Sequence, residues 1–243
     1  MSKTYYFSDD ELVVLSSLFG GMVIYGVNSK LFSYYHQSDH PQVKQIIDRL
    51  EEKGTFYFDY NGKIHFSSEV YDLIETISHP EQLLCKKTTP YSGQNETYYF
   101  YKKNDNIYQM KKGRQLLALS KCGEPFEIEG VALNISEHLT KKDVLEVEEM
   151  MGWFDEVGAF EYLKQHTHQP ELVKKIMNNE YDQYHMEYYI WEDKNISYKN
   201  LIEVGSMNQE LFEWIESGDE IIIQGGIYHY QQIIQKMFGE VKE

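Results

Sequence analysis

The sequence LEEKGTFYFDYNGKIHFSSEVYDLI, residues 50–74, joins the end of one helix, a hairpin and the start of another helix. Gly54 is a typical helix stop, because glycine readily adopts the left-handed conformation that ends a helix. A β-prone run follows, and Asn61-Gly62 is a strong signal for a two-residue hairpin turn. Ser67 can then cap the second helix. This order is typical of the wing of a winged-helix DNA-binding protein, and equally of a helical support in a binding scaffold.

Amphipathic helices are predicted on both sides of this hairpin. Pro41 stands at a permitted position at the start of the preceding helix. The apolar residues of that helix fall on one stripe, formed by Val43, Ile46, Ile47 and Leu50. The following helix ends before Pro80, and its stripe consists of Val70, Leu73, Ile74 and Ile77. Both stripes are expected to face a core.

The first helix of the chain has a well-marked start. Ser8 and Glu11 have the spacing of a capping box, in which each side chain satisfies a backbone N–H group of the other residue. Gly20-Gly21 ends this helix. Residues 22–36 are apolar and aromatic without one clear period, so they form either a second short helix or an extended connector.

Strands are predicted from residue 96 to residue 133. Four runs, ETYYFYKK, NIYQMKK, RQLLALSK and PFEIEGVAL, are separated by short turn signals, which is typical of an antiparallel meander. The segments YYFY and LLAL are apolar on both faces. Such a sheet has to be covered on both sides.

The remainder of the chain alternates between helices and strands. Thr140 with Asp143 is a second capping-box candidate, and further helices are expected at 158–166 and from Pro170 through Met177. Strands are expected at 185–192, 196–205 and 220–224. Ser206 with Gln209 predicts a capped helix through Ile215, and a last helix spans 227–238.

Strands that are grouped apart from helices predict an α+β fold rather than alternating βαβ units. We expect one α+β domain over residues 1–243, with a central antiparallel sheet flanked by helical bundles. Each half contains helices followed by an antiparallel set of strands, so the halves, about 1–133 and 134–243, form an architectural pseudo-duplication.

Composition limits the possible functions. The 243 residues include 39 acidic and 23 basic ones, for a net charge of −16, which repels phosphate backbones and anionic lipid. Cys85 and Cys122 have no CxxC spacing, so neither a disulfide framework nor a zinc site is expected. No apolar run approaches the length of a membrane span, and we expect a cytoplasmic protein that binds neither nucleic acid nor membrane.

Catalytic motifs are missing from the sequence. There is no GxSxG motif and no P-loop, and the two Gly-Gly pairs lack phosphate-binding spacing. His166 and His168 form an HxH pair in a polar stretch without a third ligand at a useful spacing. We therefore expect a non-enzymatic protein without a cofactor, a metal site or catalytic residues.

Aromatic residues on the predicted strands and helices are the candidates for partner binding. Tyrosine, with 21 copies, is enriched at protein interfaces because it offers a large contact area at low entropic cost. The same residues can also fill an ordinary sheet core, and both roles are possible on different faces. The candidate partner-binding residues are Tyr99, Tyr101, Tyr108, Trp153, Phe154, Tyr188, Trp191 and Trp214.

Electrostatics argue against the wing interpretation. The would-be recognition helix, QVKQIIDRLEEK, carries three basic and three acidic residues and is neutral. Residues 1–80 contain six basic and eleven acidic residues, a net charge of −5. A DNA-binding unit presents a basic face to phosphate, and no such face is present.

The same segments resemble EspG-like chaperones of type VII secretion systems. The resemblance rests on the order and spacing of FSDDELVVLSSLFGG, IIDRLEEKGTF and KIHFSSEVYDLIETISHPEQLL, followed by an antiparallel sheet, a helical bundle and a second set of strands. The abundance of tyrosine, lysine and glutamate is that of a low-GC Gram-positive relative. The resemblance implies a cytosolic, non-enzymatic protein that holds a secretion substrate soluble. It also implies a partner surface formed by loops of the sheet and the C-terminal helical part.

Three hypotheses follow. The first is a chaperone or adaptor that binds a helical secreted protein of a type VII-like system. The second is an acidic immunity or antitoxin-like protein that neutralises a basic toxin by charge complementarity. The third is a winged-helix transcription regulator. The oligomeric state and the identity of the partner stay open.

Overall fold

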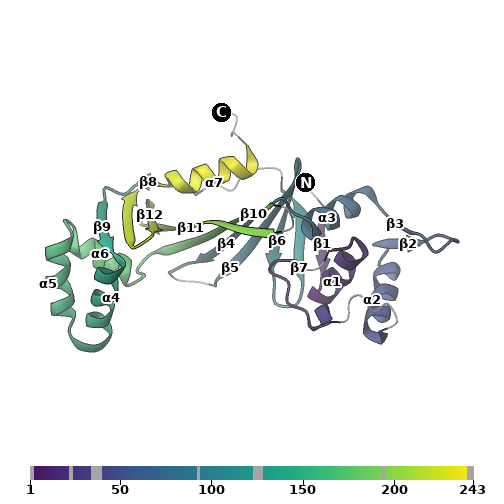
Figure 1. Cartoon of the computed structure of the whole chain (residues 1–243), viewed down its shortest axis with the longest axis horizontal. Helices are drawn as coiled ribbons and strands as arrows, with labels where there is room; N and C mark the ends of the chain where they lie inside the picture. The colour runs from purple at the N-terminus through teal and green to yellow at the C-terminus, as the bar shows by residue number, and fades with distance from the viewer. Residues whose placement is uncertain are drawn as a thin grey trace. The chain divides into compact units, whose positions relative to one another are not determined.

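The computed structural model of the chain describes residues 3–21, 24–33, 40–91, 94–122, 128–192 and 195–239 (Figure 1). The chain divides into two compact units, each built from three segments. The first unit comprises Met1–Cys85, Thr97–Glu124 and Tyr189–Ser197, and the second comprises Lys86–Glu96, Pro125–Tyr188 and Tyr198–Glu243. Each unit has its own hydrophobic core. The expected division into halves near residue 133 stays a prediction.

The first unit contains helices α1 (Asp9–Leu18), η1 (Lys30–Ser33, a 3-10 helix), α2 (Pro41–Glu52) and α3 (Ser68–Ser78). Its main strands lie in the hydrogen-bonded order β1 (Thr4–Phe7), β7 (Leu117–Lys121), β6 (Asn106–Lys112), β5 (Glu96–Lys103) and β4 (Gln82–Thr89). The pairs β1–β7, β6–β7 and β5–β6 are antiparallel. Strands β2 (Phe56–Phe58) and β3 (Ile64–Phe66) form a separate two-stranded sheet.

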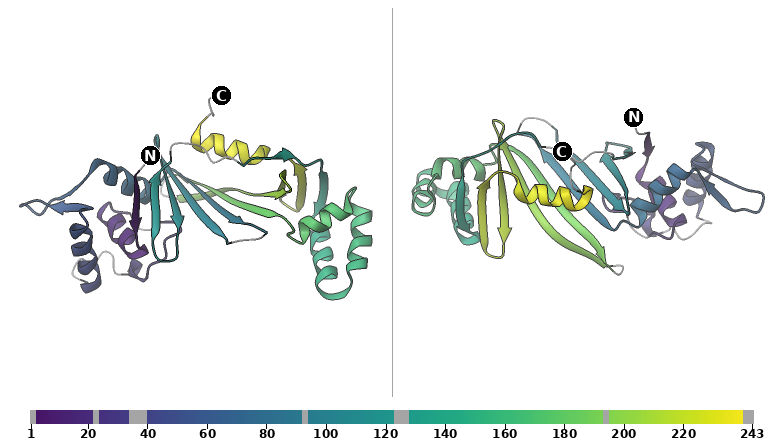
Figure 2. Two further views of the ribbon diagram at one scale, coloured as in Figure 1. Left: turned by 180° about the vertical axis from the view of Figure 1, so that it is seen from behind. Right: turned by 90° about the horizontal axis from the view of Figure 1, so that it is seen from above.

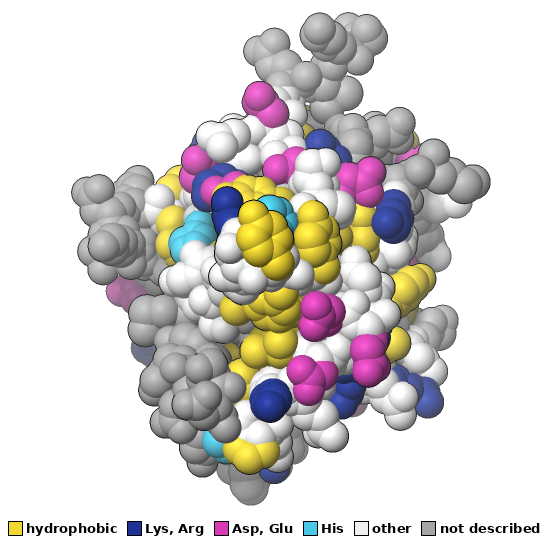
Figure 3. All heavy atoms as spheres, turned by 90° about the vertical axis from the view of Figure 1, so that its right-hand side faces the viewer, with side chains coloured by type: hydrophobic (Ala, Val, Ile, Leu, Met, Phe, Trp, Pro, Cys, Tyr) yellow, Lys and Arg dark blue, Asp and Glu magenta, His cyan; other side chains and the backbone are white. Residues whose placement is uncertain are grey.

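The structure confirms the predicted helix, hairpin and helix of residues 50–74. Gly54 has a φ of +69° just after α2, and Gly62 has a φ of +77° in the turn between β2 and β3. The Ser67 hydroxyl accepts a hydrogen bond from the backbone N–H group of Val70 and caps α3. Both views of Figure 2 show the hairpin extending away from α2 and α3. Figure 3 shows hydrophobic side chains gathered in the middle of the face that carries the hairpin.

The apolar stripes of the helices form the core of the first unit, as predicted. Leu12, Leu15, Leu50, Leu73 and Ile74 are fully buried. The predicted capping box of α1 is confirmed, because Ser8 Oγ accepts from the N–H group of Glu11 and the Glu11 carboxylate accepts from that of Ser8. Glu11 also pairs at 2.5 Å with Lys53 Nζ, at the end of α2. One buried carboxylate therefore caps α1 and ties it to α2.

The second unit contains helices α4 (Lys141–Glu149), η2 (Met150–Phe154, a π-helix), α5 (Glu156–His166), α6 (Pro170–Met177) and α7 (Tyr228–Phe238). Its strands lie in the order β10 (Asp182–Glu192), β11 (Asn195–Met207), β12 (Glu210–Ser217), β13 (Glu220–Gly225) and β9 (Ser136–Thr140). The pairs β11–β12, β12–β13 and β13–β9 are antiparallel, whereas the short β8 (Val131–Ala132) pairs with β12 in parallel. The predicted Thr140–Asp143 capping box of α4 is confirmed.

The predicted helix from Ser206 through Ile215 is wrong. Strand β11 continues to Met207 and β12 begins at Glu210, so the two form a hairpin. Both turn residues, Asn208 and Gln209, have positive φ values of 53° and 67°. Two left-handed residues in a row are typical of the tight turn that matches strand twist. The Ser206–Gln209 spacing therefore belongs to a turn, although it has the form of a capping box.

Three strands were missed by the sequence analysis, namely β1, β4 and β9. Of the predicted strand 125–133, the structure shows a strand at Val131–Ala132. Residues 123–127 lie outside the part of the chain that the structure describes. Of the ambiguous stretch 22–36, the described part contains η1 at Lys30–Ser33. The fold class is nevertheless confirmed, since antiparallel strands and segregated helices make an α+β protein.

Candidate protein-binding surface

Four of the candidate partner-binding residues are buried. Tyr99, Tyr101 and Tyr108 lie in the core of the first unit, and Tyr188 is buried in the second. The Tyr101 hydroxyl donates a hydrogen bond of 2.5 Å to the backbone carbonyl of Tyr25, and burial raises the pKa of this phenol well above its usual value. Of the two roles that the sequence left open, sheet packing and partner binding, burial favours sheet packing for these tyrosines. Their role in partner binding stays a prediction.

The tryptophans differ from these tyrosines. Trp191 is partly buried against the core of the first unit, and Trp214 is partly buried against that of the second. Trp214 lies on β12 rather than on the predicted helix. The side chains of Trp153 and Phe154 lie outside the part of the chain that the structure describes. Trp191 and Trp214 each keep an accessible edge, but neither is a strongly exposed side chain.

A strongly exposed aromatic residue that the sequence analysis missed is Tyr91. Its side chain is 71% exposed just after β4 in the second unit. Its backbone N–H group donates a 2.8 Å hydrogen bond to Asp182 Oδ1 at the start of β10, which fixes the backbone below the exposed ring. An aromatic ring on an anchored backbone loses little entropy on binding. The sequence signal for this exposed position was Pro90, which together with Tyr91 follows a β-prone run and indicates a turn.

Lysine and tyrosine side chains pack together near this turn. Lys86 is almost fully buried on β4, and its ammonium lies 4.9 Å from the centre of the Tyr184 ring on β10. Burial lowers the pKa of Lys86 to about 7, and the nearby Glu96 carboxylate opposes that shift. The cation–aromatic contact partly replaces the lost hydration of the ammonium. It also holds β4 and β10 together.

The opposite face of β10 carries a polar cluster. His185 Nδ1 lies 3.1 Å from Glu203 Oε1, and His185 Nε2 lies 3.3 Å from Glu187 Oε1. The hydrogen bond with Glu203 is the main cause of a raised pKa for His185, and desolvation opposes it. The imidazole ring of His185, placed between two carboxylates, links β10 to β11. Chemically this cluster can store a proton and tie two strands together.

We expect the His185 cluster to make stability dependent on pH. A raised folded-state pKa stabilises the fold fully below the unfolded value near 6.5, and this contribution is lost as the pH rises through the folded pKa. The contribution of His185 to the free energy of unfolding should therefore decline above about pH 6.5, by less than about 1 kcal/mol because about a third of each side chain is exposed to solvent. Lys86, with its pKa lowered to about 7, changes stability in the opposite direction over the same range, so the contribution of His185 is taken as the difference between the parent and a His185→Asn variant. Urea titrations of both proteins between pH 5.5 and 9 measure this difference, and a difference that stays constant with pH would contradict the assignment.

The helical part of the second unit is held by polar contacts between α4 and α5. The Tyr162 hydroxyl donates a 2.7 Å hydrogen bond to Asp143 Oδ1, and its ring stacks on His166 with centroids 4.1 Å apart. Leu145 on α4 and Val157 on α5 are exposed apolar side chains of these two helices. Helices α4 and α5 thus expose apolar side chains while polar contacts hold the two helices together.

Both histidines of the HxH pair, His166 and His168, make hydrogen-bond contacts within the second unit. His166 is the last residue of α5, with its Nδ1 atom 2.8 Å from the carbonyl oxygen of Tyr162. The backbone N–H group of His168 donates to both carboxylate oxygens of the buried Glu137. Within the described residues, no group of three or more His, Cys, Asp and Glu side chains is arranged to hold a metal ion.

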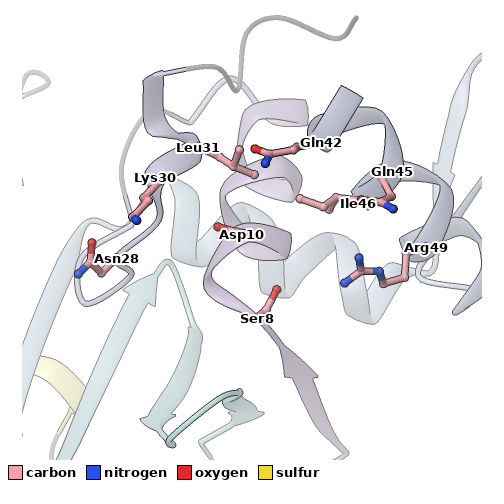
Figure 4. A pocket seen from close by; sticks show the side chains of 9 residues that line it. All are labelled: Ser8, Asp10, Asn28, Lys30, Leu31, Gln42, Gln45, Ile46 and Arg49. Carbon is pink, nitrogen blue, oxygen red and sulfur yellow. The ribbon is translucent and has the colours of Figure 1, made fainter. Parts of the chain in front are cut away.

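A polar hollow of about 450 Å³ lies among α1, η1 and α2 in the first unit (Figure 4). Two of its polar lining residues make local contacts. Asp10 accepts a 2.5 Å hydrogen bond from the Ser29 hydroxyl, and Ser8 caps α1. The hollow therefore follows from the way the connector folds back onto the first helix.

Comparison with known proteins identifies a fold but no sequence relative. No family model matches the chain, and no curated protein does. Among solved structures, the chain is similar to the Mycobacterium tuberculosis type VII secretion system chaperone EspG5 in complex with the PE25–PPE41 dimer. The TM-score is 0.65 at 8% identity, over 97% of this chain and 95% of that one. No helix among the described residues is long and apolar enough to cross a membrane. The predicted EspG-like fold is thereby confirmed over nearly the full length of the chain.

Proposed function

We propose that the chain is a non-enzymatic chaperone or adaptor that binds a helical secreted protein of a type VII-like system in the cytoplasm. The observation that carries this proposal is the shared fold over 97% of the chain with a chaperone solved in complex with its protein partner. Shared architecture over the whole length is a fold-level analogy, so the binding surface has to be argued from this chain's own residues.

The second unit offers that surface. Tyr91 supplies an exposed ring on a backbone held by Asp182, and Leu145 and Val157 supply apolar contacts on α4 and α5. Binding energy at protein interfaces is concentrated in a few aromatic anchors that lose little entropy. Tyr91 is the residue of this unit that best fits such an anchor. A role in partner binding for the eight aromatic residues named from the sequence stays a prediction.

Co-expression tests the proposal. The chain is expressed together with small helical proteins encoded beside its gene, and soluble yield and co-elution in size-exclusion chromatography are measured. A neighbour that becomes soluble and co-elutes only in the presence of the chain supports a chaperone. If no neighbour co-elutes or gains solubility, the proposal fails.

Replacing Tyr91 should weaken that complex. We expect Tyr91→Ala to lower the affinity for the partner about 30-fold, which corresponds to about 2 kcal/mol for the loss of an interfacial anchor. Isothermal titration calorimetry measures the change. Tyr6→Ala is the matched control, because Tyr6 is 59% exposed on β1 of the first unit. Equal losses of affinity in the two variants would show that Tyr91 is not part of the binding surface.

The net charge of −16 favours a second candidate, an acidic immunity or antitoxin-like protein. Salt separates the two functions, because binding that rests on opposite charges weakens with ionic strength and an apolar contact does not. An affinity that falls at least tenfold between 50 and 300 mM NaCl would favour a basic toxin as the partner.

A further inference from the structure

The β2–β3 hairpin of the first unit carries a dense group of exposed aromatic side chains. Tyr57 is 58% exposed, Phe58 is 39% exposed and Tyr60 is 98% exposed. Neighbouring strand residues point to opposite faces, so Tyr57, which stacks on His65, and Phe58, which contacts Phe56, expose rings on both faces of the hairpin. Exposed apolar side chains gathered in one place indicate a contact surface. Figure 3 shows this face, with hydrophobic side chains clustered around a histidine.

The hairpin is anchored to the core of its unit. Phe56 at the start of β2 is 2% exposed, and its ring lies 5.5 Å from those of Phe58 and Phe66. Asp59 stabilises the turn by accepting hydrogen bonds from the N–H groups of Asn61 and Lys63. The exposed rings are therefore presented from a fixed base.

A groove of about 510 Å³ adjoins the hairpin. It is lined by Leu18 and Phe19 at the end of α1, by Ile64, His65 and Phe66 of β3, and by Tyr71 of α3. The ring of Phe19 lies 5.1 Å from that of Phe66 and 5.0 Å from that of Tyr71, so three aromatic rings of the lining pack together. The groove can take an apolar side chain of a docking partner.

Charges around the groove decide which partner fits. Residues 48–75 contain three basic and seven acidic residues, a net charge of −4. Polar contacts already engage groups of both kinds, since Lys53 pairs with Glu11, His65 Nε2 lies 3.0 Å from Asp59 Oδ2, and Glu75 pairs with Lys103. The net negative charge of the segment that carries the hairpin repels nucleic acid and also repels a second copy of this acidic chain. It attracts a segment that carries lysine or arginine.

We propose that the hairpin and its groove, formed by residues 18–19, 57–60, 64–66 and 71, are a docking site for a basic segment of another protein with leucine or aromatic anchors. The apolar anchors enter the groove and contact the hairpin rings, while the flanking cations are attracted by the net negative charge of residues 48–75. This site lies in the first unit and does not depend on the chaperone function proposed for the second.

A peptide titration tests this site. The probe is a fluorescein-labelled 14-residue helix of Leu and Lys with Leu at positions i, i+3, i+4 and i+7, and fluorescence anisotropy with the full chain gives Kd. Two control probes replace every Lys with Glu or every Leu with Ser. We expect the Leu–Lys probe to bind at least tenfold more tightly than either control. Equal binding of the Ser control would show a purely electrostatic contact and overturn the proposal.

Matched variants locate the binding. Tyr57→Ser with Tyr60→Ser should weaken the Leu–Lys probe at least tenfold, whereas Tyr6→Ser with Tyr228→Ser removes two exposed tyrosines elsewhere and should change Kd less than twofold. Tyr60→Ser alone guards against misfolding, because its side chain is 98% exposed. Equal weakening in both double variants would overturn the proposal. So would a hairpin-dependent dimer in sedimentation, or hairpin-dependent binding of a labelled DNA duplex.

Discussion

Gly225→Ala should destabilise the second unit by about 3 kcal/mol or more, at the upper end of the range for overpacking. A Cβ atom on Gly225 would lie 1.6 Å from the carbonyl oxygen of Leu133 and 2.8 Å from its carbonyl carbon. Both atoms belong to the backbone, which cannot rotate away as a side chain could. The Gly225 N–H group also donates a 2.9 Å hydrogen bond to Ile135, so any displacement breaks that contact.

Thermal unfolding monitored by circular dichroism measures this loss, and we expect Tm to fall by about 6–12 °C. Gly152→Ala is the matched control, because a Cβ atom there meets no atom within 4 Å. It lies in the helical segment η2, where alanine is preferred over glycine by up to about 1 kcal/mol. The two substitutions should therefore shift Tm in opposite directions. A Gly225→Ala protein as stable as the parent would contradict the packing at β13.

Glu213→Ala should cost the second unit about 3 kcal/mol. The Glu213 side chain is fully buried on β12, and its carboxylate accepts a 2.8 Å hydrogen bond from the backbone N–H group of Tyr230. The same carboxylate lies 3.1 Å from His229 Nδ1 and 3.2 Å from Gln224 Nε2. It thus accepts from an N–H group of the first turn of α7, where a negative charge also favours the helix dipole.

The cost of this change arises because removing the carboxylate takes away the acceptor of the 2.8 Å hydrogen bond from the buried backbone N–H group of Tyr230. Urea denaturation measures the free energy of unfolding, and the fraction of helix in α7 should fall with it. Glu216→Ala, on the same strand, removes an exposed carboxylate that pairs with Lys141 at the surface. That control should change stability by less than about 0.5 kcal/mol. Similar losses of unfolding free energy in the two variants would show that Glu213 does not cap α7.

Local signals explain what the sequence analysis predicted correctly. The capping boxes at Ser8 and Thr140, the Asn61-Gly62 turn and the apolar stripe of α2 all act within a few residues. Such interactions form whatever the rest of the chain does, so they can be read from neighbouring residues. The order of these elements also supported the EspG-like resemblance, which the structural comparison confirms at the level of the fold.

Strands whose partners are distant in sequence were harder to predict. Strand β1 pairs with β7 more than 100 residues away, with Thr4 opposite Ser120, and β9 pairs with β13. The helix predicted over Ser206–Ile215 failed for a related reason. A short Ser–Gln spacing fits both a helix cap and a turn, and the adjacent strand β13 favours the extended form. Pairing at long range overrides local propensity in such segments.

Sequence alone was enough to establish the α+β class, the helical caps and the acidic surroundings of the hairpin, because these depend on composition and on neighbours along the chain. Tertiary structure decided which aromatic side chains face solvent. Tyr101 and Tyr188 lie on strands that are covered, whereas Tyr91 and Tyr60 stand on turns that nothing within the described part of their own units covers. Burial is a property of the segments that pack over a residue, and those segments come from distant parts of the chain.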